Sequence, residues 1–396
     1  MAPNRRIQYA VSWLTDCTLT LLVFAVARSM AEADAGLLTM GFVGGGFAAA
    51  LGFGSLTSGW ISDRTGSRHW TMFAGIVMLA CGALGCCLLR PTQLPYYTAY
   101  MLCGAAAGTI FPPLIADLTL GRNSVSDASQ VPRVLVLFCL SWNLGVFSGQ
   151  LGGGWLFRFD PVWPIVAAIV LAMVDAVLVL CLAGRPGAVP AVKLEADSAT
   201  REHQARSADF ARLAWLANLG STFALSMVMH LLPKLIVALD IPPHRQGMLN
   251  AITRGVVIST FLLMHRVRFW HHRFSTVAVT HVLAAIGLLV ISMARTELGL
   301  LLGLAGLAQL MGYSYFAGLY YTTTGAHDDR RGTATGINEA TLAAGLVTGS
   351  VLGGLIGHFA GDRAPYQLAA AVISGLLLIQ ALVYWRHVRP RRLAYR

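Results

Sequence analysis

The chain has 396 residues, of which 56% are hydrophobic and 12% are charged, and its mean hydropathy is +0.63. A soluble globular protein carries about 25% charged residues. The composition therefore excludes an ordinary soluble protein and predicts a polytopic membrane protein. All seven cysteines lie in apolar runs of the first half and lack zinc-ligand spacing, so we expect neither a metal site nor a cofactor.

Twelve apolar runs are each close to the length of about 20 residues that crosses a bilayer. In the first half they cover residues 7–29, 37–60, 70–90, 95–117, 133–157 and 161–183, and in the second half residues 211–238, 246–266, 274–294, 299–324, 333–359 and 366–386. The sequence predicts an all-α polytopic protein with an N-terminal six-helix bundle (1–183), a cytoplasmic linker (184–210) and a C-terminal six-helix bundle (211–396) that ends in a short basic tail.

Two glycine-rich stretches, at residues 145–154 and 345–354, suggest that the two halves are repeats of one another. Each reads G-x-x-x-G-x-x-x-G-G inside an apolar run. Residues four apart share a helix face, so each stretch forms a stripe along which another helix can approach closely. We therefore expect six helix-packing positions: Gly145, Gly149, Gly153, Gly345, Gly349 and Gly353.

The basic residues predict the orientation in the membrane. With the N-terminus inside, 21 Lys and Arg residues fall on the cytoplasmic side and 7 on the outer side, and Arg254 lies within a run. This asymmetry follows the positive-inside rule, so both termini are expected in the cytoplasm. The net charge of +11 then reflects topology, and no nucleic-acid partner is expected. We expect a monomer in a bacterial inner membrane.

The loop after the second run carries the pattern G-x-x-x-D-R-x-G-x-R at residues 59–68. It resembles the loop between the second and third helices of the major facilitator superfamily. The first glycine stripe resembles the family's fifth-helix motif, which is associated with antiporters, with Gln150 in place of a proline. The resemblance implies two pseudo-symmetric six-helix bundles, alternating access and a conformational latch formed by Gly59, Asp63, Arg64, Gly66 and Arg68.

Asp16 is the first candidate for proton coupling. It lies nine residues into the first run, which corresponds to a depth of about 14 Å at 1.5 Å per residue. An ionisable group near the bilayer centre is costly unless it is paired, protonated or facing water, so it is a functional candidate by default. The alternative is a structural aspartate bonded to a neighbouring helix.

Arg254 and Glu339 are the other ionisable candidates. Arg254 keeps its charge and therefore requires an anion, which could be Asp16, Glu339, a substrate or a purely structural partner. Glu339 could carry protons, close a cytoplasmic gate or form a fixed pair. The remaining candidates for the substrate cavity are Asn143, Gln309, Tyr313, Asn338 and Tyr100. We expect Asp175 and His281 to be structural, because the resemblance places their helices on the periphery.

These features together predict a secondary transporter, not an enzyme, that moves a small organic solute. Its driving ion is expected to be the proton, and the fifth-helix stripe favours efflux of a drug-like or amphipathic metabolite. The alternative is uptake or facilitated diffusion of a small organic anion bound by Arg254. A remoter alternative is a membrane sensor or scaffold that does not transport.

Overall fold

The computed structural model describes residues 3–119, 133–183, 198–325 and 331–390. The first half forms six helices: α1 (Pro3–Glu32), α2 (Leu37–Thr65), α3 (Arg68–Leu88), α4 (Leu94–Thr119), α5 (Arg133–Phe157) and α6 (Trp163–Ala183). The second half forms α7 (Ser198–His230), α8 (Leu232–Ala238), α9 (Pro243–Arg266), α10 (Phe274–Met293), α11 (Glu297–Gly325), α12 (Arg331–Ala360) and α13 (Ala364–Val383), which a short π-helix extends over Tyr384–Val388.

Ten of these helices are long and apolar enough to cross a membrane, and the bent pair α7 and α8 makes an eleventh span. The remaining long helix, α5, has 25 residues and coincides with the predicted run 133–157. Each other predicted run falls on one helix, except 211–238, which α7 and α8 share. The all-helical membrane fold predicted from the apolar runs is therefore confirmed.

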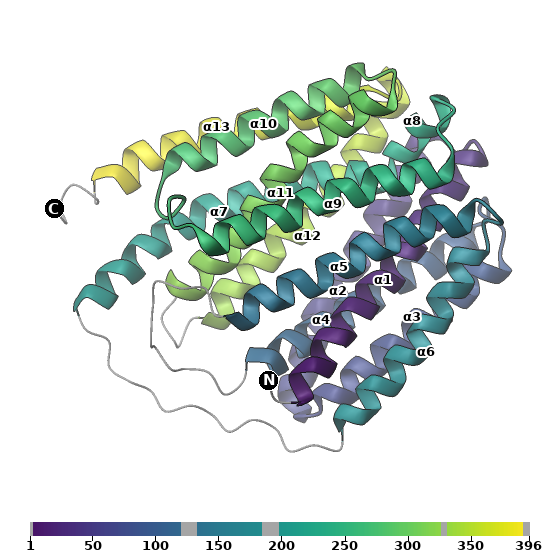
Figure 1. Ribbon diagram of the computed structural model, residues 1–396, viewed down its shortest axis with the longest axis horizontal. Helices are drawn as coiled ribbons and strands as arrows, with labels where there is room; N and C mark the ends of the chain where they lie inside the picture. The colour runs from purple at the N-terminus through teal and green to yellow at the C-terminus, as the bar shows by residue number, and fades with distance from the viewer. Residues whose placement is uncertain (1–2, 120–132, 184–197, 326–330, 391–396) are drawn as a thin grey trace.

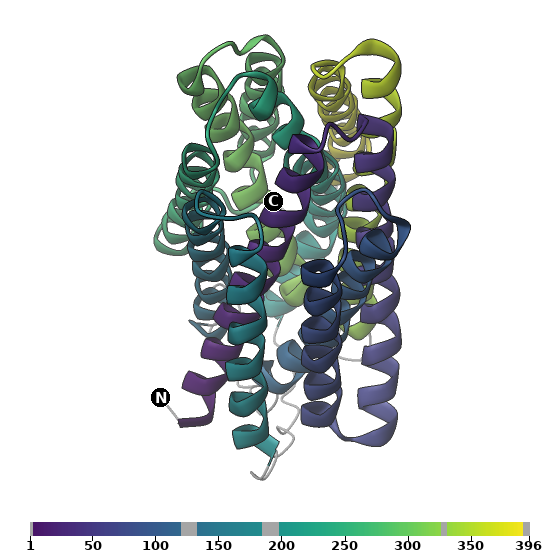
Figure 2. The same ribbon diagram turned by 90° about the vertical axis from the view of Figure 1, so that its right-hand side faces the viewer.

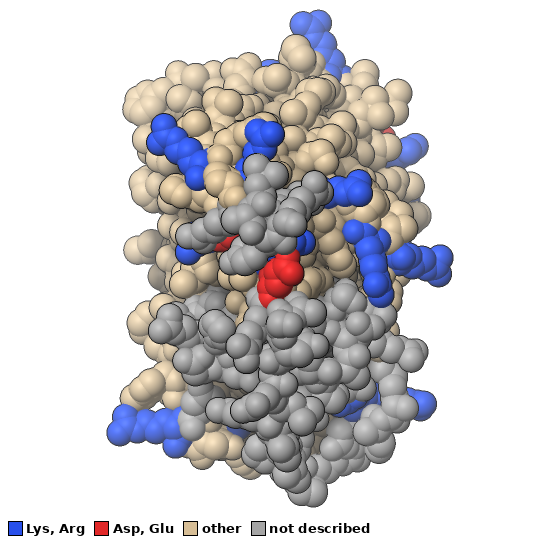
Figure 3. All heavy atoms as spheres, turned by 90° about the vertical axis from the view of Figure 1, so that its left-hand side faces the viewer, with Lys and Arg blue, Asp and Glu red and all other residues tan. Residues whose placement is uncertain are grey.

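The helices of the two halves form two groups that lie side by side (Figures 1 and 2), with the second half above the first in Figure 1. We call the end at which α1 begins and α13 finishes the terminal end, and the opposite end the far end. The terminal end lies to the left in Figure 1. Figure 3 shows this face, with Lys and Arg side chains spread over the part that the described residues form.

The glycine stripe of α5 packs against α1 inside the first bundle. A Cβ on Gly145 would lie 2.3 Å from the carbonyl oxygen of Trp13, and a Cβ on Gly149 would lie 2.7 Å from that of Cys17. Gly153 faces the ring of Phe24 in the same way, at 3.1 Å. The distances at Gly145 and Gly149 are shorter than real Cβ contacts, so glycine at these two positions permits the close approach of the two helices.

The stripe of α12 repeats this arrangement against α7 in the second bundle. A Cβ on Gly345 would lie 2.6 Å from the carbonyl oxygen of Leu219, and one on Gly349 would lie 2.1 Å from that of Phe223. Gly353 meets Met227 and Leu231. Leu219 thus takes the place of Trp13, and Phe223 that of Cys17. The matching contacts show that the two bundles are built alike at these helix pairs.

The two bundles meet at the far end through two further glycine contacts. A Cβ on Gly154 of α5 would lie 2.9 Å from the Cα of Gly247 on α9. A Cβ on Gly354 of α12 would lie 2.8 Å from the Cα of Gly41 on α2. Both crossings bring backbone against backbone, and they relate the bundles symmetrically. The far end is closed in this conformation.

Polar contacts reinforce the closed far end. Arg28 on α1 donates through Nη1 to the carbonyl oxygen of Ile241 and to Oε1 of Gln246, each at 3.0 Å. Lys234 on α8 forms an ion pair with Asp34 in the turn after α1. The hydrogen bond that Lys234 donates and its positive charge hold the pKa of the Asp34 carboxyl below its usual value. Asp34 stays ionised at neutral pH, and the pair is lost only when acid protonates it.

We expect Asp34→Asn to weaken far-end closure slightly, because Asp34 is highly exposed and surface ion pairs contribute little. The far-end-open population should rise by less than about fivefold. Electron–electron resonance distances between spin labels at Gln93 and Arg295 measure this population. The shift should persist at about pH 5, since the wild-type carboxyl is still ionised there. Asp240→Asn, at another exposed far-end carboxyl, serves as the control, and an equal shift in it would contradict the assignment.

Two features of the second bundle correct the sequence prediction. First, α7 begins at Ser198, so part of the predicted linker 184–210 is helical. The first turns of α7 are polar, so they lie outside the apolar run that predicts the membrane span. Second, the predicted run 211–238 is not one straight helix, because α7 and α8 meet at a 43° bend. Pro233 lacks the backbone N–H that would continue α7 and explains the break.

Candidate functional site

Arg254 links the two bundles at mid-depth. It extends from α9, and its Nη1 donates a hydrogen bond of 3.2 Å to Oδ1 of Asn143 on α5. Its guanidinium also lies 5.7 Å from the ring centre of Trp142, a distance at which the cation interacts with the aromatic face. Asn143 is fully buried, so the guanidinium of Arg254 makes this contact inside the protein, between the two bundles.

Asp16 lies beside this arginine. A Cβ on Gly145 would be 3.0 Å from the Cβ of Asp16, which places the carboxylate at the crossing of α1 and α5. Asp16 and Arg254 interact electrostatically, yet they are not within the 4 Å of an ion pair among the described contacts. The structure describes no hydrogen-bond partner for the buried Oδ2 of Asp16. Asp16 and Arg254 are therefore neighbours, but they do not form an ion pair in this conformation.

A second carboxylate, Asp175 on α6, belongs to the same region. It is 1% exposed and accepts a 2.6 Å hydrogen bond from the hydroxyl of Thr15, the residue before Asp16. It also interacts electrostatically with Asp16. Its depth could be read from the sequence, whereas its neighbours could not, because helix periodicity does not say which helices pack together.

The second bundle faces the site with Tyr315 and Glu339. The rings of Tyr315 and Trp142 meet edge to face at 5.2 Å across the bundles. Both Asp16 and Glu339 interact electrostatically with the Tyr315 hydroxyl, so the two carboxylates approach this tyrosine from opposite bundles. Glu339 is exposed and accepts a 3.4 Å hydrogen bond from Asn338. Among the described residues it has no cation within ion-pair distance.

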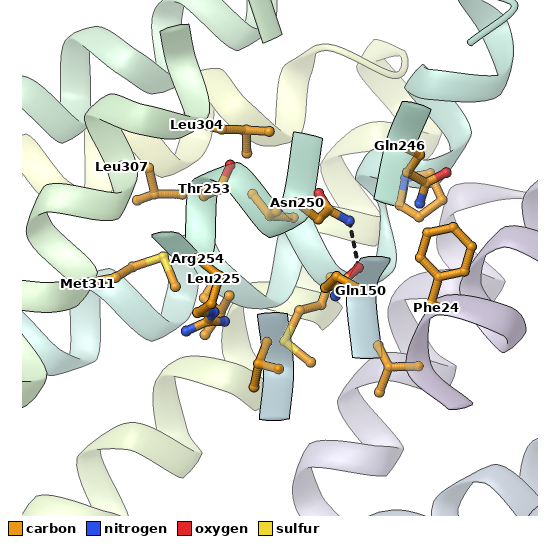
Figure 4. Close-up of a pocket in the computed structure, with 15 residues that line it drawn as sticks. Phe24, Gln150, Leu225, Gln246, Asn250, Thr253, Arg254, Leu304, Leu307 and Met311 are labelled. Carbon is orange, nitrogen blue, oxygen red and sulfur yellow. Dashed lines mark hydrogen bonds between the residues drawn. The ribbon is translucent and has the colours of Figure 1, made fainter. Parts of the chain in front are cut away.

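A small cavity extends from Arg254 toward the far end. It has a volume of about 40 Å³, which is room for a few water molecules. Asn250 donates to Gln150 across its middle at 2.9 Å, with Arg254 and Met311 on one side and Gln246 and Phe24 on the other (Figure 4). A drug-sized solute needs a pocket of about 300 Å³ or more. In this conformation the far side of the site is therefore too small for such a solute.

The other predicted cavity residues lie further from this centre. Gln309 on α11 accepts a hydrogen bond from Thr260 of α9 inside the second bundle. Tyr313 is 2% exposed and packs 6.5 Å from the ring of Trp270, so it belongs to the bundle core. Asn338 is held by Asn218 of α7 at 2.9 Å.

Tyr100, also predicted to line the cavity, lies between the bundles in the far half. Its hydroxyl is 3.0 Å from Nε2 of His230 on α7, and its ring stacks on Phe47 at 4.7 Å. A Cβ on Gly44 would collide with the His230 ring, so a glycine on α2 makes room for the histidine. This contact belongs to the closed far end, not to the centre around Arg254.

The loop motif lies at the terminal end. Gly66 ends α2 with φ = 66°, a left-handed conformation that favours glycine, and its N–H donates to the carbonyl oxygen of Ser62. The guanidinium of Arg64 lies 5.0 Å from the ring of Trp60. The side chain of Asp63 lies outside the described residues. Arg68 begins α3, and a Cβ on Gly59 would meet no atom within 4 Å. The latch stays a prediction.

Asp117 was not singled out in the sequence, yet it ties three helices together near this loop. Its Oδ2 accepts from Nε2 of Gln8 on α1 at 2.5 Å and lies 3.4 Å from Nε2 of His69 on α3. An acidic residue at the end of an apolar run was the available signal. His281, predicted to be structural, bonds to Gln380 of α13 at 2.9 Å within the second bundle.

Paired helical bundles with an ionisable centre at mid-depth define a class of polytopic membrane transporters, not enzymes. Comparison with family models makes the assignment specific, because the model described as Major Facilitator Superfamily matches residues 9–324. The chain belongs to the major facilitator superfamily. A search of curated proteins finds no match.

Solved transporter structures share the fold at low sequence identity. The human organic anion transporter MFSD10 (TETRAN) is 16% identical with a TM-score of 0.65, and the alignment covers 96% of this chain and 100% of that one. The POT family transporter PepTSo is 13% identical with a TM-score of 0.72, covering 95% and 97%. A bacterial homologue of the human lysosomal transporter Spinster, inward-facing and unoccupied, is 15% identical with a TM-score of 0.65, covering 98% of both chains.

Proposed function

We propose that this secondary transporter is proton-coupled and that Asp16 carries the proton. The observation that supports the proposal most strongly is that Asp16 is next to Arg254 without being fixed to it, with a buried oxygen that has no described hydrogen-bond partner. An ionisable group at mid-depth that is not locked in a pair can change its charge as access alternates. Glu339, across Tyr315, is the second candidate for proton transfer.

The charge of this centre separates two substrate classes. When Asp16 is ionised it balances Arg254, and the centre accepts a neutral or cationic amphipathic solute. Protonation of Asp16 leaves one positive charge, which repels a cation and releases it. Proton and solute then compete, as exchange requires, so we propose efflux of a drug-like or amphipathic metabolite. The glycine stripe of α5 agrees with this direction.

The second candidate is uptake of a small organic anion together with a proton. Its specific support is that Arg254 donates to a neutral amide, and no described carboxylate lies within ion-pair distance of it. A substrate carboxylate could therefore occupy its free donors when Asp16 is protonated. The fold neighbour MFSD10 is named an organic anion transporter, which makes this class worth testing.

We further propose that the terminal end faces the cytoplasm of a bacterial inner membrane and that the protein acts as a monomer. The basic residues at that end support this orientation by the positive-inside rule. In this orientation the closed far end makes the described conformation inward-facing. A cysteine introduced at Asp328 should be labelled only from inside, and one at Asp362 only from outside.

Flux in proteoliposomes with an imposed pH difference tests the function. An efflux substrate should accumulate against its gradient when protons flow the opposite way, and its binding to purified protein should weaken in acid. Ethidium is a suitable cationic probe, and benzoate is the anionic comparison. Tighter benzoate binding in acid, with proton-parallel flux, would favour the second candidate. Flux that ignores the pH difference for both probes would contradict proton coupling.

A further inference from the structure

Asp175 is a buried carboxylate with only half of its hydrogen-bonding capacity used. Thr15 donates to Oδ2 at 2.6 Å, whereas Oδ1 is buried and has no described partner. A buried polar atom left without a partner destabilises the folded state, and does so more strongly if it is charged. Such a group in the middle of α6 therefore requires an explanation beyond helix packing.

No cation on the helices around Asp175 is described within ion-pair distance of it. α6 packs against α1, α3 and α5. The charged group of α1 that is described as interacting electrostatically with Asp175 is Asp16. Residues 70–88 of α3 and 134–157 of α5 contain no charged side chain, and their titratable groups are cysteines. Because two ionised carboxylates are strongly disfavoured together in one apolar site, Asp16 and Asp175 are not expected to be ionised at the same time.

The second bundle shows that this position does not need an acid for packing. α6 and α13 both carry proline as their second residue, Pro164 and Pro365, which aligns Asp175 with Leu376. A Cβ on Gly220 of α7 would lie 2.9 Å from the Cδ1 of Leu376, so that helix pair meets through apolar atoms. At this matched position the carboxylate is therefore a feature of the first bundle and not of the second.

Thr15 connects Asp175 to the centre. It precedes Asp16 on α1 and is fully buried, so any movement of α1 displaces Asp16 and the hydrogen bond to Asp175 together. By the glycine contacts, Asp16 and Thr15 correspond to Thr222 and Ser221 on α7. There the hydroxyl of Ser221 bonds to Ser314, and no carboxylate takes part.

We propose that Asp175 is a second proton-holding group of the coupling centre and that it sets the pH at which Asp16 exchanges its proton. It acts as a positioning residue, because its charge changes the cost of ionising Asp16. The inference rests on the proposed role of Asp16. Two neighbouring carboxylates cannot both ionise cheaply in one buried site, so the pair titrates in two coupled steps.

Infrared spectroscopy of purified protein, from about pH 5 to about pH 9, tests this without any transport assay. Asp175→Asn should remove one carbonyl band of a protonated carboxylic acid. It should also move the midpoint of the remaining Asp16 band to lower pH by about half a unit or more, because a like charge has been removed. Asp175→Glu should keep both bands. Gln380→Leu, which removes a buried polar group from α13, is the matched control and should shift neither.

Thr15→Val supplies a second measurement if Asp175→Asn folds poorly. It removes the hydrogen bond but leaves the carboxyl, so the Asp175 band should persist at a higher frequency. An unmoved band in Thr15→Val, or an unchanged Asp16 midpoint in folded Asp175→Asn, would overturn the proposal. Wild-type flux that ignores a pH gradient would instead contradict the proposed function, so the two failures are distinguishable.

Discussion

Replacing Asp16 by asparagine is expected to abolish accumulation of substrate driven by a pH gradient, while downhill exchange is partly retained. Asparagine preserves the size of the side chain at the crossing of α1 and α5, where Gly145 leaves room for it. It cannot bind or release a proton, so transport becomes independent of the gradient. The substrate gradient should therefore dissipate to equilibrium at any imposed pH difference, because no proton movement is left to drive uphill transport.

Two variants control for a structural effect of this change. Asp16→Glu keeps a titratable group and should retain partial coupling. Asp16→Thr places in α1 the residue that α7 carries at the matching contact, Thr222, so it should fold but remain uncoupled. Flux in proteoliposomes, with and without a pH difference, compares all three. If Asp16→Asn still concentrates substrate as the wild type does, Asp16 is structural and Glu339 becomes the leading candidate.

Most of the fold could be predicted because the bilayer imposes a simple rule. Each span needs about 20 apolar residues, and this length can be read directly from the chain. The glycine stripes added real packing information, since Gly145, Gly149, Gly345 and Gly349 all meet backbone of a neighbouring helix. The break at Pro233 was missed because hydropathy continues smoothly through it, although the proline itself was a visible signal.

The site could be predicted only in part. Asp16 and Arg254 could be proposed as site residues because a charge at mid-depth is rare and costly. Their closeness came from the structure, as did the participation of Trp142, Tyr315 and Asp175. Aromatic residues are common in membrane helices, so neither Trp142 nor Tyr315 stood out. Tyr313 shows why depth alone does not define the site: its depth suggested the cavity, whereas in this conformation its ring packs near Trp270.

Leucine at Gly154 or Gly354 is expected to have the second large effect, because these glycines close the far end between the bundles. A Cβ at Gly154 would lie 2.6 Å from the carbonyl oxygen of Pro243, and one at Gly354 would lie 2.7 Å from that of Leu37. Backbone atoms cannot turn aside as a flexible side chain can. Overpacking costs about 1–3 kcal/mol, which here falls on the closed conformation and corresponds to about a 5–150-fold shift toward the far-end-open state.

Both variants should therefore insert normally, show longer spin-label distances between Gln93 and Arg295, and lose transport by at least about tenfold. Gly149→Leu is a useful contrast, since Gly149 packs against α1 inside one bundle. It should lower the thermal stability of the first bundle and leave the far-end distances unchanged. Gly255→Leu is the control on α9, because a Cβ there meets no atom within 4 Å. If both Gly154→Leu and Gly354→Leu keep wild-type distances and flux, these crossings do not govern closure. Far-end closure would then depend on Arg28 and its partners on the second bundle.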